Sequence, residues 1–232
     1  MIIKDIKLNL DVSDLLSKQR TGASFRAQPH MGAIMSELLR DVREDHLLEP
    51  SAAFEIFSIE EVRKDGISLY GGHVIFSRAF SMHIGSAEEL AVSVCTIGTG
   101  LENRAAELFK NNQRLHGLLL DSIGSYAVEN LCEEICRFIG EQASSRGSQI
   151  GNQLRPGMPG FSLLEQINLF GLVYAQDIGV SLTSAQVMSP VKSASLIVGI
   201  GHQMARFSKS ETCALCNLNK TCRFKTQPAS IR

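Results

Sequence analysis

The sequence has little net charge, because 23 Lys and Arg residues against 24 Asp and Glu residues leave a formal charge of −1 over 232 residues. A surface without an excess of one sign does not attract nucleic acid or anionic lipid over its whole area. We therefore expect neither a nucleic acid nor a membrane as a partner. Recognition must then depend on local sites.

Long hydrophobic runs are also absent. No stretch approaches the roughly 18 uninterrupted apolar residues of a transmembrane helix, and the first residues lack the basic and apolar regions of a signal peptide. We therefore expect a cytoplasmic protein without a membrane anchor. The length allows a sizeable hydrophobic core without disulfides.

Several common site motifs are incomplete. Gly98-Thr99-Gly100 is followed by Asn103 where a dinucleotide fingerprint would have glycine, and no Lys-Ser or Lys-Thr pair follows it as in a P-loop. The segment is therefore predicted to be a tight turn rather than a phosphate site. His30-Met31-Gly32 lacks the Asp-x-His-x-x-Gly arrangement of cobalamin-ligating domains, and no Ser, His and Asp grouping resembles a hydrolase elbow.

Hydrophobic periodicity predicts a mixture of helices and strands. We expect helices over residues 12–18, 31–47, 101–110 and 115–143, and one that begins at a capping box formed by Ser162 and Glu165 and runs to about Gln176. Strands are expected within residues 3–10, 54–57, 67–70, 73–76, 88–97, 180–182 and 195–200. The strands between residues 53 and 79 suggest an antiparallel meander.

The chain is predicted to divide into three parts. Residues 1–50 form an N-terminal strand and helix extension, residues 51–204 form the core, and residues 205–232 form a basic tail that contains cysteine. Within the core, residues 144–153 are rich in Ser, Gly and Gln and are the best candidate for a linker.

The cysteines fall into two groups. Cys95, Cys132 and Cys136 lie in apolar or helical surroundings and are interpreted as reduced, small hydrophobic residues. Cys213-Ala214-Leu215-Cys216 with Cys222 has a spacing that suits a shared metal, so zinc or an iron–sulfur cluster is one interpretation. A redox-active thiol pair and plain thiols in a tail are the others.

Residues 154–166 contain the strongest candidate for a binding loop. Arg155 can hold a carboxylate by two parallel hydrogen bonds, the prolines and glycines from Pro156 to Gly160 keep side-chain bulk low, and Phe161 offers an apolar face. A simple proline-glycine connection before a capped helix is the alternative. Glu129 lies inside the apolar run of the longest helix, either at a solvated edge or held there for a function.

Four segments, taken together, resemble the activation (reactivation) domain of vitamin B12-dependent methionine synthase, most closely its stand-alone form. These segments are Leu120–Glu129, Arg155–Gln166, Gly179–Thr183 and Met188–Ser195, in the same order and spacing as in that family. The resemblance covers roughly residues 50–204, about two thirds of the chain.

The resemblance implies a C-shaped α+β fold in which helices flank a twisted antiparallel sheet. It also implies binding of S-adenosylmethionine (AdoMet) and closure over the corrinoid of a partner protein. Cobalt in such systems occasionally oxidises from Co(I) to inactive Co(II), and methyl transfer from AdoMet removes the Co(I) formed by an uphill reduction and so draws that reduction forward. The protein then supplies positioning, since donor and corrinoid supply the chemistry.

Carried over by position, the resemblance implies a set of donor-binding residues. They are Glu129, Arg155, Pro159, Gly160, Phe161, Pro190, Lys192, Ser193 and Ser195. Within this set Arg155 would hold the AdoMet carboxylate. The chain departs from the family pattern by one additional residue between Arg155 and Phe161, by Phe161 in place of a tyrosine, and by Val198 in place of an aromatic residue.

These observations lead to one main hypothesis and two alternatives. The main hypothesis is an accessory subunit that reactivates a corrinoid protein, as a component of a split methionine synthase or another B12-dependent methyltransferase. Its expected partners are a corrinoid-binding protein or methyltransferase subunits, with a flavodoxin- or ferredoxin-type protein as the candidate electron donor. The alternatives are a redox adaptor that uses Cys213, Cys216 and Cys222, and a docking scaffold that has lost AdoMet binding.

Overall fold

The computed structural model describes residues 1–18, 29–78, 83–205 and 211. The chain divides into two compact units. Unit 1 comprises Met1–Phe54, Ser93–Arg137 and Val173–Ser195. Unit 2 comprises Glu55–Val92, Phe138–Leu172 and Leu196–Arg232.

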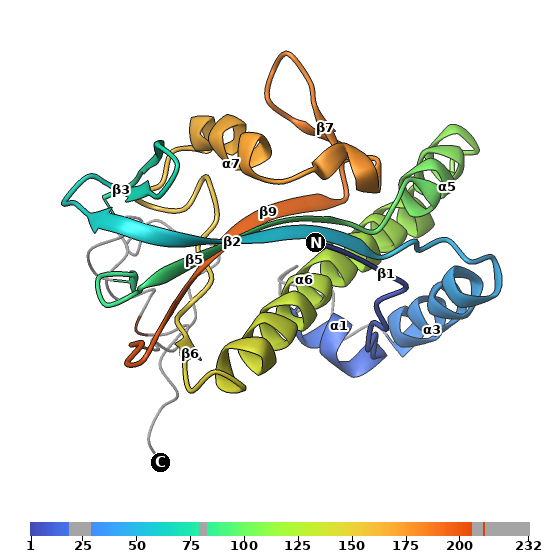
Figure 1. The fold of residues 1–232 in the computed structure, drawn as a ribbon. Helices are drawn as coiled ribbons and strands as arrows, with labels where there is room; N and C mark the ends of the chain where they lie inside the picture. Colours follow the sequence, from blue (N-terminus) through green and yellow to red (C-terminus); the bar gives the residue numbers. More distant parts are fainter. Residues whose placement is uncertain (19–28, 79–82, 206–210, 212–232) are drawn as a thin grey trace. The chain divides into compact units, whose positions relative to one another are not determined.

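Unit 1 is mainly helical. Its elements are β1 (Ile2–Lys4), α1 (Val12–Lys18), α3 (Pro29–Glu44), α5 (Gly100–Lys110), most of α6 (Arg114–Ser144), the 3₁₀ helix η2 (Ala175–Ile178), β7 (Ser181–Leu182) and β8 (Met188–Ser189). Helices α1 and α3 lie beside the long helix α6 in Figure 1, and the Tyr126 hydroxyl of α6 lies 3.4 Å from the Asp14 carboxylate of α1. Strands β7 and β8 form a separate antiparallel pair.

Unit 2 contains the antiparallel meander. Its elements are β3 (Gly66–Leu69), β4 (His73–Phe76), β6 (Gln149–Ile150), the 3₁₀ helix η1 (Leu163–Glu165) and α7 (Gln166–Leu172). Strand β3 pairs with β4 over its whole length, from Gly66 opposite Phe76 to Leu69 opposite His73. Glycines Gly71 and Gly72, both with positive φ, form the tight turn between these strands.

Three strands contribute residues to both units. They are β2 (Ser51–Val62), β5 (Glu89–Thr96) and β9 (Ser193–Gly201). The hydrogen-bonding order of the main sheet in the described part of the chain is β4-β3-β2-β5-β9-β6, and β1 pairs with β2 as well. The pairs β1–β2, β2–β3, β3–β4 and β6–β9 are antiparallel. The protein is therefore α+β with an antiparallel sheet and flanking helices, as expected.

The buried residues follow the predicted periodicities. In α3 the buried side chains are Met31, Met35, Leu38, Leu39 and Val42, which form one face of the helix. Strand β5 is buried from Leu90 onward, and β9 is buried from Ala194 onward. Because successive strand residues point to opposite faces, burial of nearly every residue means that both faces of these strands are covered, which explains why their sequences are almost continuously apolar.

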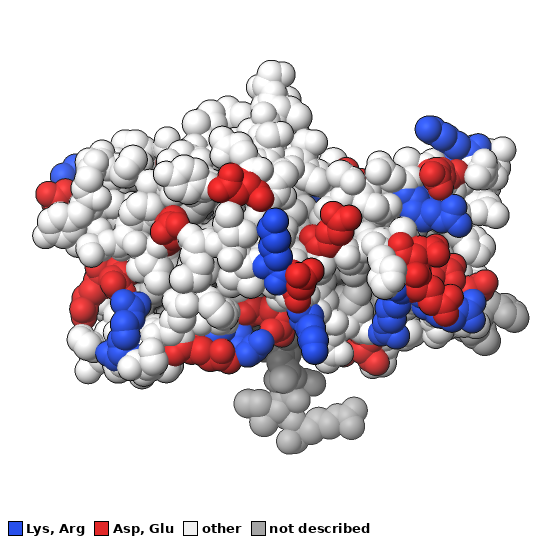
Figure 2. Space-filling model, turned by 45° about the vertical axis from the view of Figure 1, so that its right-hand side comes forward, with Lys and Arg blue, Asp and Glu red and all other residues white. Residues whose placement is uncertain are grey.

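The charge balance of the sequence is visible on the surface. Figure 2 shows basic and acidic side chains interspersed on the face that it displays. No helix in the described residues is long and apolar enough to cross a membrane.

Two local predictions were wrong. The expected linker at residues 144–153 contains strand β6, whose Gln149 and Ile150 pair with Gly201 and Ile200 of β9. The expected helix from Ser162 to Gln176 is broken, because α7 ends at Leu172 and η2 follows it as a separate turn. Gly179 does cap this region, in the left-handed conformation with φ of 71°, but it follows η2.

Candidate functional site

The residues predicted to bind the methyl donor fall into two groups, one in each unit. Glu129, Pro190, Lys192, Ser193 and Ser195 belong to unit 1. The other four belong to the loop after β6 in unit 2 and are Arg155, Pro159, Gly160 and Phe161. That the two groups line one donor pocket stays a prediction.

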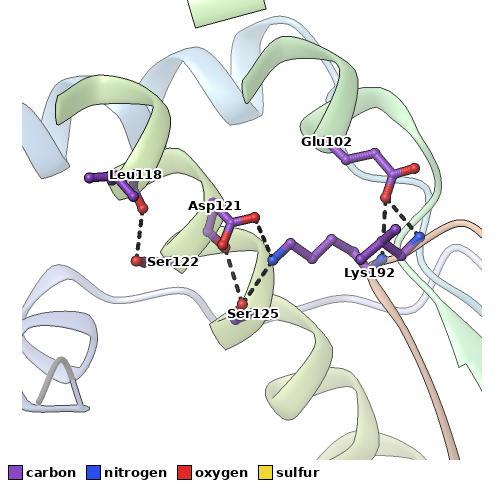
Figure 3. A network of polar contacts seen from close by, with 7 residues as sticks. Glu102, Leu118, Asp121, Ser122, Ser125 and Lys192 are labelled. Atoms are coloured by element: carbon purple, nitrogen blue, oxygen red, sulfur yellow. Dashed lines mark hydrogen bonds and ion pairs between the residues drawn. The ribbon is translucent and has the colours of Figure 1, made fainter. Parts of the chain in front are cut away.

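Lys192 is the centre of a polar network in unit 1. Its side chain is only 10% exposed, and its ammonium group lies 2.7 Å from Asp121 Oδ1 and 2.9 Å from Ser125 Oγ on α6 (Figure 3). The aliphatic part of the side chain crosses α6 at Gly124, where an added Cβ would lie 3.1 Å from Lys192 Cε. The small residue on α6 therefore makes room for the lysine, and the aspartate one turn earlier neutralises its charge.

The backbone around Lys192 is held by the start of α5. Oε2 of Glu102 accepts hydrogen bonds from the backbone N–H groups of Val191, at 2.9 Å, and Lys192, at 3.3 Å (Figure 3). Glu102 lies in the first turn of α5, where a carboxylate also interacts favourably with the helix dipole. Glu102 therefore fixes the segment that leads into β9.

Ser193 and Ser195 are also engaged by the protein itself. The Ser193 hydroxyl lies 2.9 Å from Thr96 Oγ1 and 2.7 Å from the Pro190 carbonyl oxygen, and Ser195 is buried. The Lys192 carbonyl accepts a hydrogen bond from the Ile97 N–H at 3.1 Å. These contacts make the 190–195 segment a rigid part of unit 1, and its binding to a donor stays a prediction.

The Gly98-Thr99-Gly100 segment is the tight turn that the sequence predicts. A Cβ at Gly100 would lie 2.8 Å from the Leu47 carbonyl oxygen, and one at Gly98 would lie 3.1 Å from Glu49 Cβ. Gly100 is therefore required by close packing, and Gly98 is required by its positive φ of 78°. The carboxylates of Glu49 and Glu102 lie near this helix start, so an anion would be repelled there.

Glu129 lies on α6, four residues after Ser125, and is half-buried. One turn before it, Tyr126 is buried, and its burial raises the pKa of the phenol, assisted by the negative charge of Asp14. Tyr126 therefore stays protonated at neutral pH. The role of Glu129 toward a donor stays a prediction.

The loop after β6 in unit 2 is organised by its own backbone. Gly157 N–H donates to the Phe161 carbonyl at 2.8 Å, Phe161 N–H donates to the Met158 carbonyl at 2.9 Å, and Met158 N–H donates to the Arg155 carbonyl at 3.0 Å. Gly157 and Gly160 both have positive φ, of 93° and 81°, which side chains other than glycine rarely adopt. The glycines are therefore required by the path of the loop.

The same loop is attached to β9 and to the residues that follow β4. Leu154 and Ile197 of β9 exchange two backbone hydrogen bonds, each of 2.9 Å. The Gly160 carbonyl accepts from the Arg78 N–H at 2.8 Å and from the Ser77 hydroxyl at 2.9 Å. The side chain of Arg155 donates to Gln153 Oε1 at 3.2 Å. Arg155 is therefore presented by a loop that is fixed at both ends.

Glu165 connects the helix after this loop to strand β4. It is only 9% exposed, and its Oε2 accepts from the Phe76 N–H at 3.1 Å and from Asn168 Nδ2 at 2.8 Å. Ser162 caps the helix start as predicted, accepting from the Leu164 N–H. The other hydrogen bond of the predicted capping box, from the Ser162 N–H to the Glu165 carboxylate, was wrong. The Glu165 carboxylate accepts from the Phe76 N–H of β4 instead.

An open groove lies beside the loop in unit 2. Its volume is about 500 Å³, and its lining includes Asp65, Phe76, Arg78, Gly160 and Phe161. Phe161 is only 2% exposed and lines the groove as a buried apolar wall, and its contact with a donor stays a prediction. Ligand pockets in proteins commonly measure about 300–1,000 Å³, so the groove has room for a nucleoside-sized molecule.

The predicted metal ligands Cys213, Cys216 and Cys222 lie outside the described residues. Among the residues that are described, no group of three or more His, Cys, Asp and Glu side chains is arranged to hold a metal ion. Cys95, Cys132 and Cys136 are thiols, as the sequence predicts, and the first two are fully buried.

Sequence reasoning missed the partners that complete these sites. Asp121 and Ser125 are four residues apart on one face of a helix, which is a detectable signal, but nothing local connects them to Lys192. No local sequence pattern predicts the contacts of Glu102, Ser77 and Arg78, because their partners lie more than 80 positions away in the sequence.

The fold and the loop define a class: an α+β domain whose antiparallel sheet carries an Arg-Pro-Gly loop beside a groove. This fold is that of the MetH reactivation domain. A crystal structure of the MetH reactivation domain bound to AdoHcy matches 90% of this chain and 80% of its own, with a TM-score of 0.59 and 13% sequence identity. No protein-family model matches the sequence. No curated protein matches it either.

Proposed function

We propose that this protein is an accessory subunit for the reductive reactivation of a corrinoid protein, and that it presents AdoMet as the methyl donor. The observation that carries the proposal is the shared fold, over 90% of the chain, with a domain whose crystal structure contains AdoHcy. AdoHcy is what remains of AdoMet after methyl transfer. The neighbour's ligand is therefore the product form of the methyl donor that we propose for this protein.

The residues of unit 2 suit such a ligand. The guanidinium of Arg155 can form two charge-assisted hydrogen bonds with the amino-acid carboxylate of AdoMet. The two glycines with positive φ let the ligand approach the loop backbone closely. Asp65, in the groove lining, supplies a negative charge that can attract the positive charge of a sulfonium donor. We therefore assign donor recognition to the Arg155 loop and its groove.

The contacts of Lys192 and Ser193 support a different role for the 190–195 segment. Their polar atoms already bind Asp121, Ser125, Thr96 and the Pro190 carbonyl, so the segment is held in one conformation by unit 1 itself. We propose that the segment is a fixed structural part of unit 1.

The remaining parts of the proposal concern partners. A corrinoid-binding protein would bring the cobalt, methyltransferase subunits would use the reactivated corrinoid, and a flavodoxin- or ferredoxin-type protein would supply the electron. We place this system in the cytoplasm. Methyl transfer from AdoMet supplies the chemistry, and this chain supplies the position of the donor.

Replacing Arg155 with alanine is expected to weaken AdoMet binding by about 1–3 kcal/mol, the loss typical of a charged hydrogen-bonded pair. Isothermal titration calorimetry with AdoMet and AdoHcy measures this loss. Arg63→Ala is the matched control, because Arg63 also lies in unit 2 but pairs with Glu61 at 2.7 Å. The control is expected to bind like the unmodified protein.

Two results would count against the proposal. One is an absence of heat with AdoMet both alone and in the presence of a methylcorrinoid protein, which would favour a docking scaffold if that partner is still captured. The other is equal binding by Arg155→Ala and Arg63→Ala, which would remove Arg155 from the site. Stoichiometric iron and sulfide in the purified protein, lost in Cys216→Ser, would favour the redox adaptor.

A further inference from the structure

Two cysteines far apart in the sequence lie side by side in unit 1. Cys95 of β5 and Cys132 of α6 are separated by 37 positions, yet their Sγ atoms are 3.7 Å apart and form a hydrogen bond. Both side chains are completely buried, at 0% exposure. Neither residue belongs to the donor-binding set or to the cysteine group at residues 213–222.

We propose that Cys95 and Cys132 are a redox modification site that forms a reversible intramolecular disulfide. A disulfide has an S–S length of about 2.05 Å, so the two sulfurs need to approach by about 1.7 Å. Rotation of two side chains about Cα–Cβ supplies much of such a movement. The distance between the sulfurs is therefore short enough for side-chain rotation to bring them toward bonding distance.

The chemistry requires an oxidant, for which we name hydrogen peroxide. One thiolate attacks a peroxide oxygen, which yields a sulfenic acid and releases hydroxide, protonated to water. The second thiol then attacks the sulfenic sulfur, forming the S–S bond and releasing a second water. Two electrons pass from the two thiols to the peroxide, and a dithiol reductant reverses the reaction by thiol–disulfide exchange.

Burial of Cys95 and Cys132 slows their oxidation by peroxide. The thiolate is the reactive form, and apolar surroundings disfavour it. Cys136 lies one turn after Cys132 on α6 and is half-buried, so it should react with reagents before the pair does. The disulfide is therefore a response to sustained oxidation.

The position of the pair connects it to the Lys192 network. Thr96, next to Cys95, contacts Ser193, while Asp121 and Ser125 of α6 hold the Lys192 ammonium group. A Cys95–Cys132 bond would tie together β5 and α6. Lys192 already contacts both elements, because its carbonyl accepts from Thr96 Oγ1 of β5 at 3.4 Å and its ammonium group binds Asp121 of α6. Oxidation would thus fix the spacing that sets the position of the 190–195 segment.

Peptide mapping of the full-length protein tests the proposal. The protein is treated with hydrogen peroxide, its remaining thiols are alkylated under denaturing conditions, and the digest is analysed by mass spectrometry. Trypsin places Cys95 in a different peptide from Cys132 and Cys136, and cleavage after Glu133 or Glu134 separates Cys132 from Cys136. The expected result is a Cys95–Cys132 cross-linked peptide that disappears after dithiothreitol treatment.

Matched variants complete the test. Cys136→Ala should retain the cross-link, and Cys95→Ala and Cys132→Ala should each lose it. The proposal is overturned if Cys95 is recovered fully alkylated after prolonged oxidation of folded protein, or if the only cross-links join Cys136 or the cysteines at 213, 216 and 222. These outcomes do not depend on AdoMet, so they are independent of the proposed function.

Discussion

The Asp121→Ala variant is expected to lose about 3 kcal/mol of unfolding free energy, whereas Lys192→Met loses about 1 kcal/mol, although both changes break the same ion pair. Asp121→Ala leaves the Lys192 ammonium, only 10% exposed, with Ser125 as its remaining hydrogen-bond partner in the network. Lys192→Met leaves the Asp121 carboxylate, which is 53% exposed and can be hydrated by water. The asymmetry follows from which charge is buried.

Urea unfolding of the three proteins measures the difference. Glu107→Ala is a suitable control, because Glu107 and Arg104 form an ion pair of 3.1 Å in which both side chains are about half exposed. Exposed pairs contribute about 0–1 kcal/mol, so the control should change little. The Asp121→Ala/Lys192→Met double variant should recover stability relative to Asp121→Ala alone. Equal losses in the two single variants would contradict the interpretation.

The Glu165→Ala variant is expected to lose about 2 kcal/mol of unfolding free energy, because it leaves the part-buried Phe76 N–H without its acceptor and removes the contact with Asn168. Glu165→Gln keeps an oxygen that can accept from the same two donors, and we expect it to lose less than about 1 kcal/mol. Urea unfolding again provides the measurement.

Glu60→Ala provides the control for Glu165, since Glu60 is an exposed carboxylate of β2 in the same unit. Its replacement should change the unfolding free energy by less than about 0.5 kcal/mol. If Glu165→Ala behaves like Glu60→Ala, the carboxylate does not connect α7 to β4. If Glu165→Gln is as damaging as Glu165→Ala, the negative charge rather than the hydrogen-bond geometry is what matters.

Much of the secondary structure could be predicted because it depends on near neighbours. The buried face of α3 recurs at three- and four-residue spacing, and the Ser162 cap acts on an N–H two residues away. The resemblance to the reactivation domain, carried by four segments in register, was also sufficient to anticipate the fold that the structural comparison confirms. Strand β6 was missed because its two residues have no periodic pattern of their own.

The sequence alone therefore determined the class of fold, the turn at residues 98–100 and the loop that presents Arg155. Only the tertiary structure decided that Lys192 binds Ser125, 67 positions away, that Glu165 binds Phe76, 89 positions away, and that Cys95 meets Cys132. Periodicity and caps are properties of neighbouring residues. The partner of a buried charge or thiol depends instead on which distant segment the folded chain places beside it.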